Sequence, residues 1–187
     1  MLKILATICI IGMATSSCTS KKASRTESSH EAEPELTMIV GTYTSGDSKG
    51  LYSFRFNEEN GTATALSEAE VENPSYLVPS ADGKFIYAVS EFSNDQAAAN
   101  AFAFNKEEGT FRLLNTQKTE GEDPCYIITN GSNVITANYS GGSISVFPID
   151  KDGSLLPAST VVKFKGSGAD KERQEKPHLH CVRITPD

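Results

Sequence analysis

Residues 73–91 read NPSYLVPSADGKFIYAVSE, and this stretch decides the fold because its pattern returns twice further along the chain. Residues 123–126 (DPCY) lead into IITNGSNVITANY, and residues 176–180 (KPHLH) lead into CVRITPD. The prolines of the three copies are 50 and 53 residues apart. Self-similarity at a long, nearly fixed period is typical of repeat architectures, in which each repeat is one supersecondary unit.

A second landmark runs in phase with the first. The stretches GLYSFRFNEENGTATAL, NAFAFNKEEGTFRLL and SISVFPIDKDGSLLPA each read as an alternating strand, a polar turn containing glycine, and another strand. Phe54, Phe102 and Phe147 mark the same position in the three stretches, 48 and 45 residues apart. The turn glycines are Gly61, Gly109 and Gly153. We therefore expect a strand directly after the turn in every copy.

The local sequence of the repeats is that of β-structure. Residues 51–56 (LYSFRF) alternate their faces, and residues 84–89 (KFIYAV) are rich in strand formers. The pairs at residues 82–83 (DG) and 130–131 (NG) lie between apolar runs. Such pairs predict tight hairpins in which both central turn positions have positive φ. No window of the folded part has a convincing helical period with caps.

About four short strands per unit of about 50 residues is the signature of a β-propeller blade. A β-sandwich also has short strands at regular spacing, but it gives no reason for a long internal repeat. We therefore predict an all-β fold, a β-propeller of four-stranded antiparallel blades. The third copy stops at Asp187, inside what the first copy shows to be a hairpin turn. Because a closed propeller needs roughly four to eight blades, we expect these three or so blades to be the N-terminal part of a longer protein.

Residues 1–17 have the pattern of an export signal. A short positive start is followed by an apolar run of eleven residues over 4–14, which is too short to span a bilayer. Small residues and then Cys18 come next, an order that resembles a bacterial lipoprotein signal with Cys18 as the lipid site. The alternative is an ordinary secretory signal cleaved near Ser16. We predict an exported protein, in the periplasm or at the outer membrane, whose membrane contact is the lipid anchor alone.

The signal is followed by a predicted disordered tether over residues 18–36. Residues 19–35 contain no large aliphatic or aromatic side chain, so burial cannot offset the entropy of ordering them. The folded part is expected over residues 37–187.

Charge and cysteine content argue against two kinds of site. The 17 Lys and Arg against 24 Asp and Glu give a net charge of −7, which disfavours nucleic-acid binding. Only Cys125 and Cys181 lie in the predicted folded part, and no CxxC spacing supports a structural zinc site. Each precedes a strand in a different repeat, so we predict two separate thiols, although export would permit a disulfide.

Five segments occur in an order that resembles the bacterial lactonase family of seven-bladed β-propellers, over about residues 38–187. They are residues 40–44 (VGTYT), 73–91, 123–130 (DPCYIITN), 137–143 (ANYSGGS) and 173–180 (RQEKPHLH). The resemblance extends to fungal carboxymuconate-lactonizing enzymes. It implies a seven-bladed propeller about twice as long as the folded part here, of which about three blades are present. It also implies hydrolysis of a sugar lactone such as 6-phosphogluconolactone, with no cofactor and no metal.

Lactone hydrolysis is attack of water on an ester carbonyl. It needs a base for the water, a donor for the developing oxyanion and, with a phosphorylated substrate, a cation that holds the phosphate. In a propeller these groups belong at equivalent ends of the repeats, where loops converge at the mouth of the axial channel. Residues at such ends are Glu91 in the first copy, Asn138 and Tyr139 in the second, His178 and His180 in the third, and Arg173 just before them.

Together with the resemblance, these positions predict that Glu91 and His180 share the acid/base work and that Arg173 binds an anionic group or the oxyanion. His178, Asn138 and Tyr139 are the predicted substrate-binding residues. Structural alternatives remain open. Glu91 could be a solvated carboxylate at a strand end, and Asn138 could only satisfy backbone groups at a turn. Tyr139 could pack within the blade, and Arg173 could be an ordinary exposed side chain. The two histidines share one face of a strand, but no third metal ligand is evident.

Two classes of function stay open. One is an enzyme, either a lactone hydrolase or a related lactone-forming cycloisomerase. The other is an exported binding propeller that kept the scaffold and lost the chemistry, because a fold alone does not fix a function. An exported enzyme would meet lactones other than the cytosolic 6-phosphogluconolactone. The complete protein is expected to be a monomer that takes a small-molecule lactone.

Overall fold

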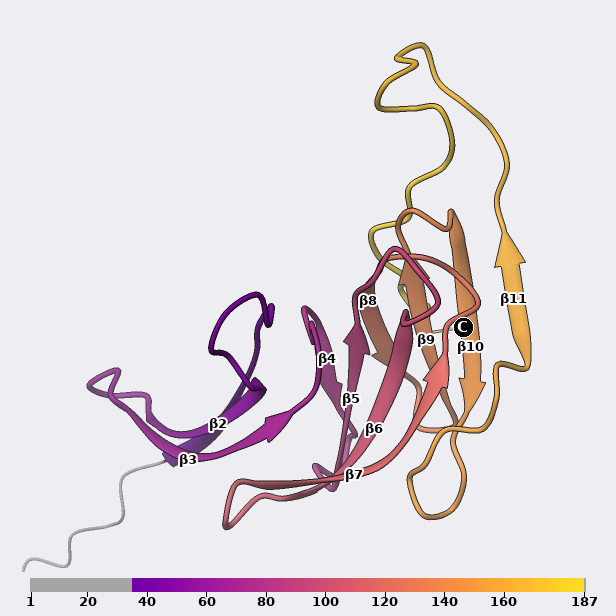
Figure 1. The fold of residues 1–187 in the computed structure, drawn as a ribbon. Helices are drawn as coiled ribbons and strands as arrows, with labels where there is room; N and C mark the ends of the chain where they lie inside the picture. The colour runs from indigo at the N-terminus through magenta and orange to yellow at the C-terminus, as the bar shows by residue number, and fades with distance from the viewer. Residues whose placement is uncertain (1–34, 187) are drawn as a thin grey trace, which may run out of the picture. The chain divides into compact units, whose positions relative to one another are not determined.

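The computed structural model describes residues 35–186 and arranges their strands in three antiparallel sheets, with no helix in this part of the chain (Figure 1). Blade A contains β1 (Glu35–Gly41), β2 (Gly50–Asn57) and β3 (Ala63–Glu70). Blade B contains β4 (Leu77–Pro79), β5 (Phe85–Ser90), β6 (Ala98–Asn105) and β7 (Thr110–Lys118). Blade C contains β8 (Pro124–Thr129), β9 (Asn133–Asn138), β10 (Ser143–Pro148) and β11 (Thr160–Lys163). The predicted all-β architecture of antiparallel blades is confirmed.

The three blades are structural copies in a common register. The cross-strand pairs at the shared register position are Met38–Phe54, Ile86–Phe102 and Val134–Phe147. In β2 and β6 the ladder shifts just before this phenylalanine. The strand β1 is therefore equivalent to β5 and β9. Within residues 35–186, blade A has no counterpart of the first strands of the other blades, β4 and β8.

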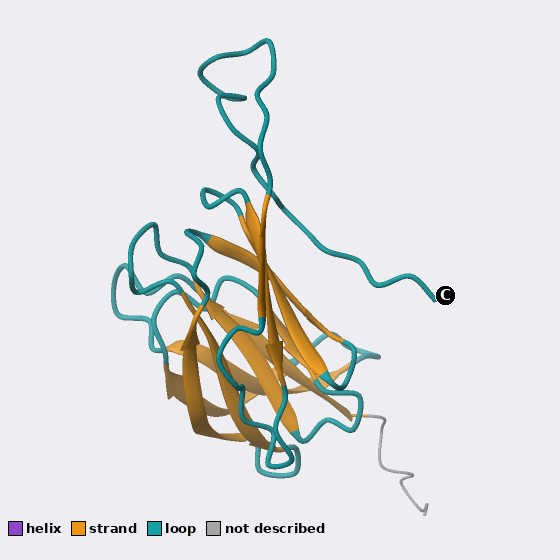
Figure 2. Ribbon diagram, turned by 90° about the vertical axis from the view of Figure 1, so that its right-hand side faces the viewer, coloured by secondary structure: helices purple, strands orange, loops and turns teal. Residues whose placement is uncertain are grey.

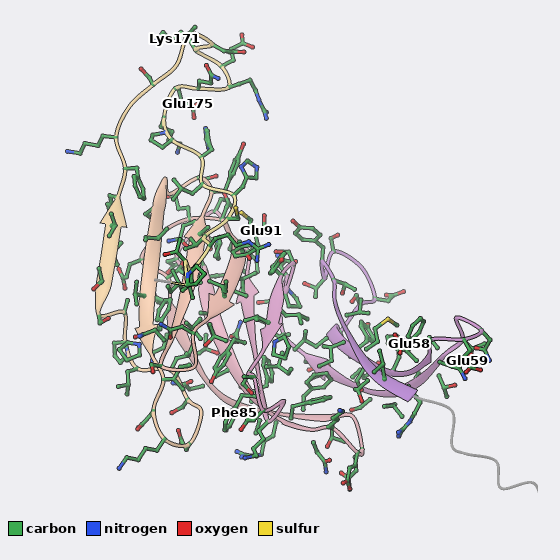
Figure 3. The ribbon with its side chains drawn as sticks, turned by 180° about the vertical axis from the view of Figure 1, so that it is seen from behind. Glu58, Glu59, Phe85, Glu91, Lys171 and Glu175 are labelled. Atoms are coloured by element: carbon green, nitrogen blue, oxygen red, sulfur yellow. The ribbon has the colours of Figure 1, made fainter. Side chains whose placement is uncertain are left out.

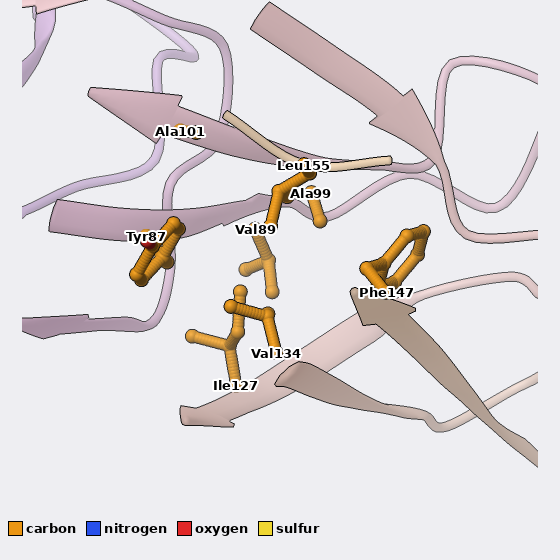
Figure 4. Packing of buried hydrophobic residues seen from close by; sticks show 8 residues of the cluster. All are labelled: Tyr87, Val89, Ala99, Ala101, Ile127, Val134, Phe147 and Leu155. Carbon is orange, nitrogen blue, oxygen red and sulfur yellow. The ribbon is translucent and has the colours of Figure 1, made fainter. Parts of the chain in front are cut away.

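The hydrophobic core fills the two interfaces between neighbouring blades. Eight buried side chains join blades B and C (Figure 4), namely Tyr87, Val89, Ala99, Ala101, Ile127, Val134, Phe147 and Leu155. A smaller cluster joins blades A and B, namely Leu51, Ile86, Ala88 and Phe102. Successive residues of β5 thus alternate between the two interfaces, as the period of two along a strand requires.

The turn glycines of blades B and C pack against the preceding blade. Gly109 has a φ of 71° and accepts a hydrogen bond of 2.6 Å at its carbonyl from the Ser53 hydroxyl of blade A. Gly153 has a φ of 87° and accepts one of 3.2 Å from the Tyr87 hydroxyl of blade B. A Cβ at Gly153 would lie 2.1 Å from Cε1 of Phe85, so only glycine allows this approach. Each hairpin turn therefore helps to hold two blades together.

The hairpins expected at residues 82–83 and 130–131 form, but their turn geometry differs from the prediction. Only the glycines, Gly83 and Gly131, have positive φ. The Ser80 amide donates to the Phe85 carbonyl at 2.8 Å, which makes the first loop longer than a two-residue turn. Asp82 accepts hydrogen bonds from the Ser80 hydroxyl and the Lys84 amide, so its side chain supports an ordinary backbone conformation there.

The prediction of a strand directly after Gly153 is wrong. Residues 154–158 contribute one isolated bridge, between Ile149 and Leu155, and β11 begins only at residue 160. The backbone of Leu155 instead bonds to blade B, where Asn115 donates to its carbonyl at 2.7 Å and accepts from its amide at 3.0 Å. Pro157 has no amide hydrogen to donate to a ladder. This segment therefore packs into the interface between the blades and joins the sheet later.

Residues 164–186 contain no strand, and in Figure 2 the first part of this segment extends as a loop beyond the sheets. The strand expected after Cys181 is absent from the described residues, which end at residue 186, and no neighbouring strand pairs with this segment. Glu35 and Leu36, predicted as the end of the tether, belong to β1. The signal over residues 1–17 and the rest of the tether lie outside the described residues. No helix within the described part is long and apolar enough to cross a membrane.

Candidate active site

One position recurs in each blade and builds the candidate site. It lies just past the equivalent strands β1, β5 and β9. The shared register makes Tyr43, Glu91 and Tyr139 equivalent, and they are spaced by 48 residues. Together with Ser75, Cys125 and His180 they line one cavity of about 390 Å³. This volume falls in the range of roughly 300–1,000 Å³ that is usual for small-molecule sites. The structure therefore brings three of the predicted site residues together.

The repeated proline motif supplies the second set of cavity residues. Asn73 and Asp123, which precede the prolines, have φ values of 47° and 51°, a left-handed conformation that Asn and Asp tolerate better than most residues. The Asn73 carbonyl accepts the Glu91 amide at 3.0 Å, and the Asp123 carbonyl accepts the Tyr139 amide at 2.8 Å. The same turn thus places Ser75 beside Glu91 and the equivalent Cys125 near Tyr139.

Glu91 has two hydroxyl donors on one of its carboxylate oxygens. Tyr43, from blade A, donates to Oε2 at 2.9 Å, and Ser75, from blade B, donates to the same oxygen. Partial desolvation of its hydroxyl, followed by the hydrogen bond and the negative charge of Glu91, raises the pKa of Tyr43 above its ordinary value of 10.0. The phenol therefore stays protonated and remains a donor at neutral pH.

The two histidines both contact the ring of Tyr139, in different geometries. The rings of His178 and Tyr139 stack with centroids 4.5 Å apart, while His180 meets the same tyrosine ring edge-on at 4.7 Å. Glu175 Oε1 lies 3.2 Å from Nε2 of His178, whose side chain is 17% exposed. The buried Nδ1 of His178 has no hydrogen-bond partner among the described residues. Tyr139 therefore contacts a partly buried imidazole, that of His178, and an exposed one, that of His180.

Cys125 attaches the histidine segment to blade C. Its thiol donates toward the carbonyls of Leu179 and His180, at 3.5 and 3.7 Å. Burial, and then the charge of Glu91, raise the pKa of Cys125 above its ordinary value of 9.0, so the thiol stays protonated. Cys125 and Cys181 are both free.

Three of the six predicted site residues do not line the cavity, namely His178, which stacks on Tyr139, and Asn138 and Arg173. Asn138 is fully buried in blade C, where its amide group donates to Ser143 and Ser145 and accepts from Thr136. It supports the turn that carries Tyr139. Arg173 is exposed in the loop after β11, where its backbone amide donates to Asp170 at 3.1 Å. Figure 3 shows Lys171 at the tip of this loop, far from Glu91.

A second hollow, of about 490 Å³, lies between the outer loops of blades B and C. Three lysines line it together with Asp95, Glu120 and Glu122, so its positive and negative charges balance. None of the predicted acid/base residues lines this hollow. Among the residues that the structure describes, no group of three His, Cys, Asp or Glu side chains is placed to hold a metal ion. The cavity around Glu91 is therefore the better candidate.

Sequence reasoning missed four contributors to the candidate site, namely Tyr43, Ser75, Cys125 and Glu175. The repeat itself could have found the first three. Tyr43 lies one period of 48 residues before Glu91, and Ser75 and Cys125 each follow the repeated proline by one position. Glu175 had no such signal, because its contact with His178 depends on how an irregular loop folds back.

Comparison with known proteins identifies the family. Residues 37–187 match the family described as lactonase, 7-bladed beta-propeller. A 6-phosphogluconolactonase from Bacillus subtilis is 38% identical over 154 residues, which cover 79% of this chain and 43% of that protein. A crystal structure from Bacteroides fragilis, of a candidate 6-phosphogluconolactonase, is 74% identical with a TM-score of 0.80 and covers 81% of this chain and 43% of its own.

A third similar protein is a periplasmic gluconolactonase from Pseudomonas aeruginosa. Its structure is 30% identical with a TM-score of 0.63 and covers 70% of this chain and 39% of its own. The chain thus spans less than half the length of the relatives it matches. These matches confirm the predicted propeller fold.

Proposed function

The chain belongs to the lactonase family of seven-bladed β-propellers, and we propose that the protein that carries it hydrolyses a sugar lactone, 6-phosphogluconolactone or a related one. One observation carries this proposal. A carboxylate and an imidazole, those of Glu91 and His180, line the same cavity with hydroxyl donors beside them. This is the set of groups that water attack on an ester carbonyl needs.

In the proposed reaction Glu91 is the general base. Its carboxylate takes a proton from water while the water oxygen bonds to the lactone carbonyl carbon. The ring C–O bond then breaks, and His180 gives a proton to the leaving ring oxygen. A positioned acid or base contributes roughly 10²–10⁴-fold to such a rate. Arg173, if its loop moves toward the cavity, would bind the phosphate or the oxyanion.

A sugar lactone without a phosphate is a second candidate substrate. The described residues that line the cavity include no lysine and no arginine, and Glu91 adds a negative charge. Such a lining disfavours a phosphate and suits the hydroxyl groups of a neutral sugar. The name of the Pseudomonas aeruginosa relative, a periplasmic gluconolactonase, agrees with this possibility.

The test is hydrolysis by the intact protein of a panel that contains phosphorylated and neutral sugar lactones. Glu91→Gln and His180→Ala should each lower kcat by about 10²–10⁴-fold with the fold intact. Arg173→Ala should raise KM for a phosphorylated lactone if Arg173 binds the phosphate, and should lower kcat if it binds the oxyanion. Lys171→Ala in the same loop is its control. Normal turnover by both Glu91→Gln and His180→Ala would overturn the assignment. Binding of lactones without turnover would favour the non-catalytic alternative.

We further propose export as a lipoprotein with Cys18 as the lipid site, on the strength of the signal pattern in residues 1–17. Cys18→Ala should abolish fatty-acid labelling and move the protein from the membrane fraction to the soluble fraction. Membrane association that survives this substitution would contradict the lipid anchor. We propose that the complete protein is a monomer, which sedimentation would test.

A further inference from the structure

Hydroxyl groups from two different blades converge on a single oxygen of Glu91. The Tyr43 hydroxyl comes from the loop after β1, and the Ser75 hydroxyl comes from the turn before β4. Both donate to Oε2, whereas Oε1 accepts no hydrogen bond from the described residues. The two oxygens of one carboxylate therefore have different surroundings.

The backbone around Glu91 is fixed by the same two segments. Asn73 accepts the Glu91 amide at its carbonyl, and its side chain donates to the Glu91 carbonyl at 3.3 Å. The Asn73 side-chain oxygen in turn accepts from the Thr44 amide and hydroxyl, at 3.0 and 3.1 Å. The loop of blade A that carries Tyr43 is thereby tied to the strand end that carries Glu91.

We propose that Tyr43 and Ser75 are positioning residues that occupy Oε2 of Glu91 and leave Oε1 as the oxygen presented to the substrate, an inference that rests on the proposed lactone hydrolysis. A carboxylate can rotate about its last bond and offer either oxygen. Two donors on one oxygen stop this rotation, and charge-assisted hydrogen bonds are the strong ones. A base held in a productive orientation needs no rearrangement when it takes the proton from the attacking water.

The chemistry of the donors supports this role. The raised pKa of Tyr43 keeps its proton on the phenol, so the hydrogen bond persists through the neutral and mildly alkaline range. Tyr43 is 59% exposed, so core packing does not explain where its hydroxyl lies. The equivalent pair in blade C is Cys125 and Tyr139, neither of which is a carboxylate. The arrangement is thus specific to the position of Glu91.

The test is a double-mutant cycle in the intact protein on a hydrolysed lactone. Tyr43→Phe and Ser75→Ala should each lower kcat about tenfold, the size expected when one hydrogen bond to a charged group is lost, with KM nearly unchanged. In a Glu91→Gln background the same substitutions should cause no further loss, because they act only through the carboxylate. Tyr52→Phe and Ser159→Ala are matched controls whose hydroxyls bond elsewhere, and both should keep full kcat.

The outcomes separate this inference from the proposed function. If Glu91→Gln lowers kcat and the hydroxyl substitutions lower it by the same factor in both backgrounds, the positioning role is wrong and the base assignment stands. If Glu91→Gln leaves kcat unchanged, both are wrong. Thermal unfolding of each variant shows whether it is folded, and Ser75→Ala tests the role on its own if Tyr43→Phe does not fold.

Discussion

Replacement of Gly153 by alanine should destabilise the protein more than the same change at Gly131. The two glycines have the same φ, 87°, in the left-handed region that costs other L-residues roughly 1–2 kcal/mol. They differ in what surrounds them. A Cβ at Gly153 would lie 2.1 and 2.3 Å from two ring carbons of Phe85, whereas a Cβ at Gly131 would meet nothing within 4 Å.

The magnitude follows from this difference. Overpacking of an interior contact costs roughly 1–3 kcal/mol, because a ring or the backbone must move. Gly153→Ala should therefore lower the free energy of unfolding by about 2–5 kcal/mol, and Gly131→Ala by about 1–2 kcal/mol. A shift of the Gly153 turn would also weaken the hydrogen bond that its carbonyl accepts from Tyr87.

Urea unfolding of both variants, followed by circular dichroism, measures the difference. The comparison is valid where the m-value is unchanged, since a changed slope signals a different denatured or native state. Equal losses of stability in the two variants would refute the idea that the Gly153 turn is held against blade B by close packing. A loss at Gly131 larger than at Gly153 would refute it as well.

Three further predictions concern pH, the aromatic contacts and the thiols. A hydrogen bond from the Ser80 hydroxyl lowers the pKa of Asp82 to about 2. The ionised carboxylate should therefore stabilise the protein fully above about pH 4, and this stabilisation should disappear as the pH falls through about 2. Asp82→Asn should flatten the dependence of the free energy of unfolding on pH in this range. Tyr139→Leu should lower kcat about tenfold or more, because it removes the aromatic ring against which the His180 ring packs. Tyr139→Phe keeps the ring and should retain activity. The exposed Cys181 should be alkylated before Cys125, whose raised pKa and partial burial protect it, and mass spectrometry of a time course measures the order.

The blades could be predicted from the sequence because their spacing is set by local rules. The repeat of proline motifs and of Phe54, Phe102 and Phe147 follows the strand register directly. The geometry of the turns was harder to predict, because it depends on tertiary contacts. Residues 154–158 look like a strand by composition, yet two side-chain amides of blade B bind the backbone of Leu155 instead.

The candidate site was predictable where it follows the repeat and not where it depends on loops. Glu91, Tyr139 and His180 stand at repeat ends and do line one cavity. Asn138 also stands at a repeat end, but its side chain turns into the blade because three neighbouring hydroxyls satisfy it there. Arg173 lies in a loop without a regular partner, so no periodicity indicates where its side chain goes.

The equivalence of Tyr43, Glu91 and Tyr139 has a consequence for how new activities could arise on this scaffold. These positions lie just past β1, β5 and β9, outside the strand segments that pack into the buried interfaces. An exchange there alters the chemistry of the cavity without removing a core contact, so it should be accepted at little cost in stability. Every blade thus offers a separate place at which a carboxylate, a phenol or an imidazole can be tried. Diversification of substrates could proceed one blade at a time while the rest of the protein stays unchanged.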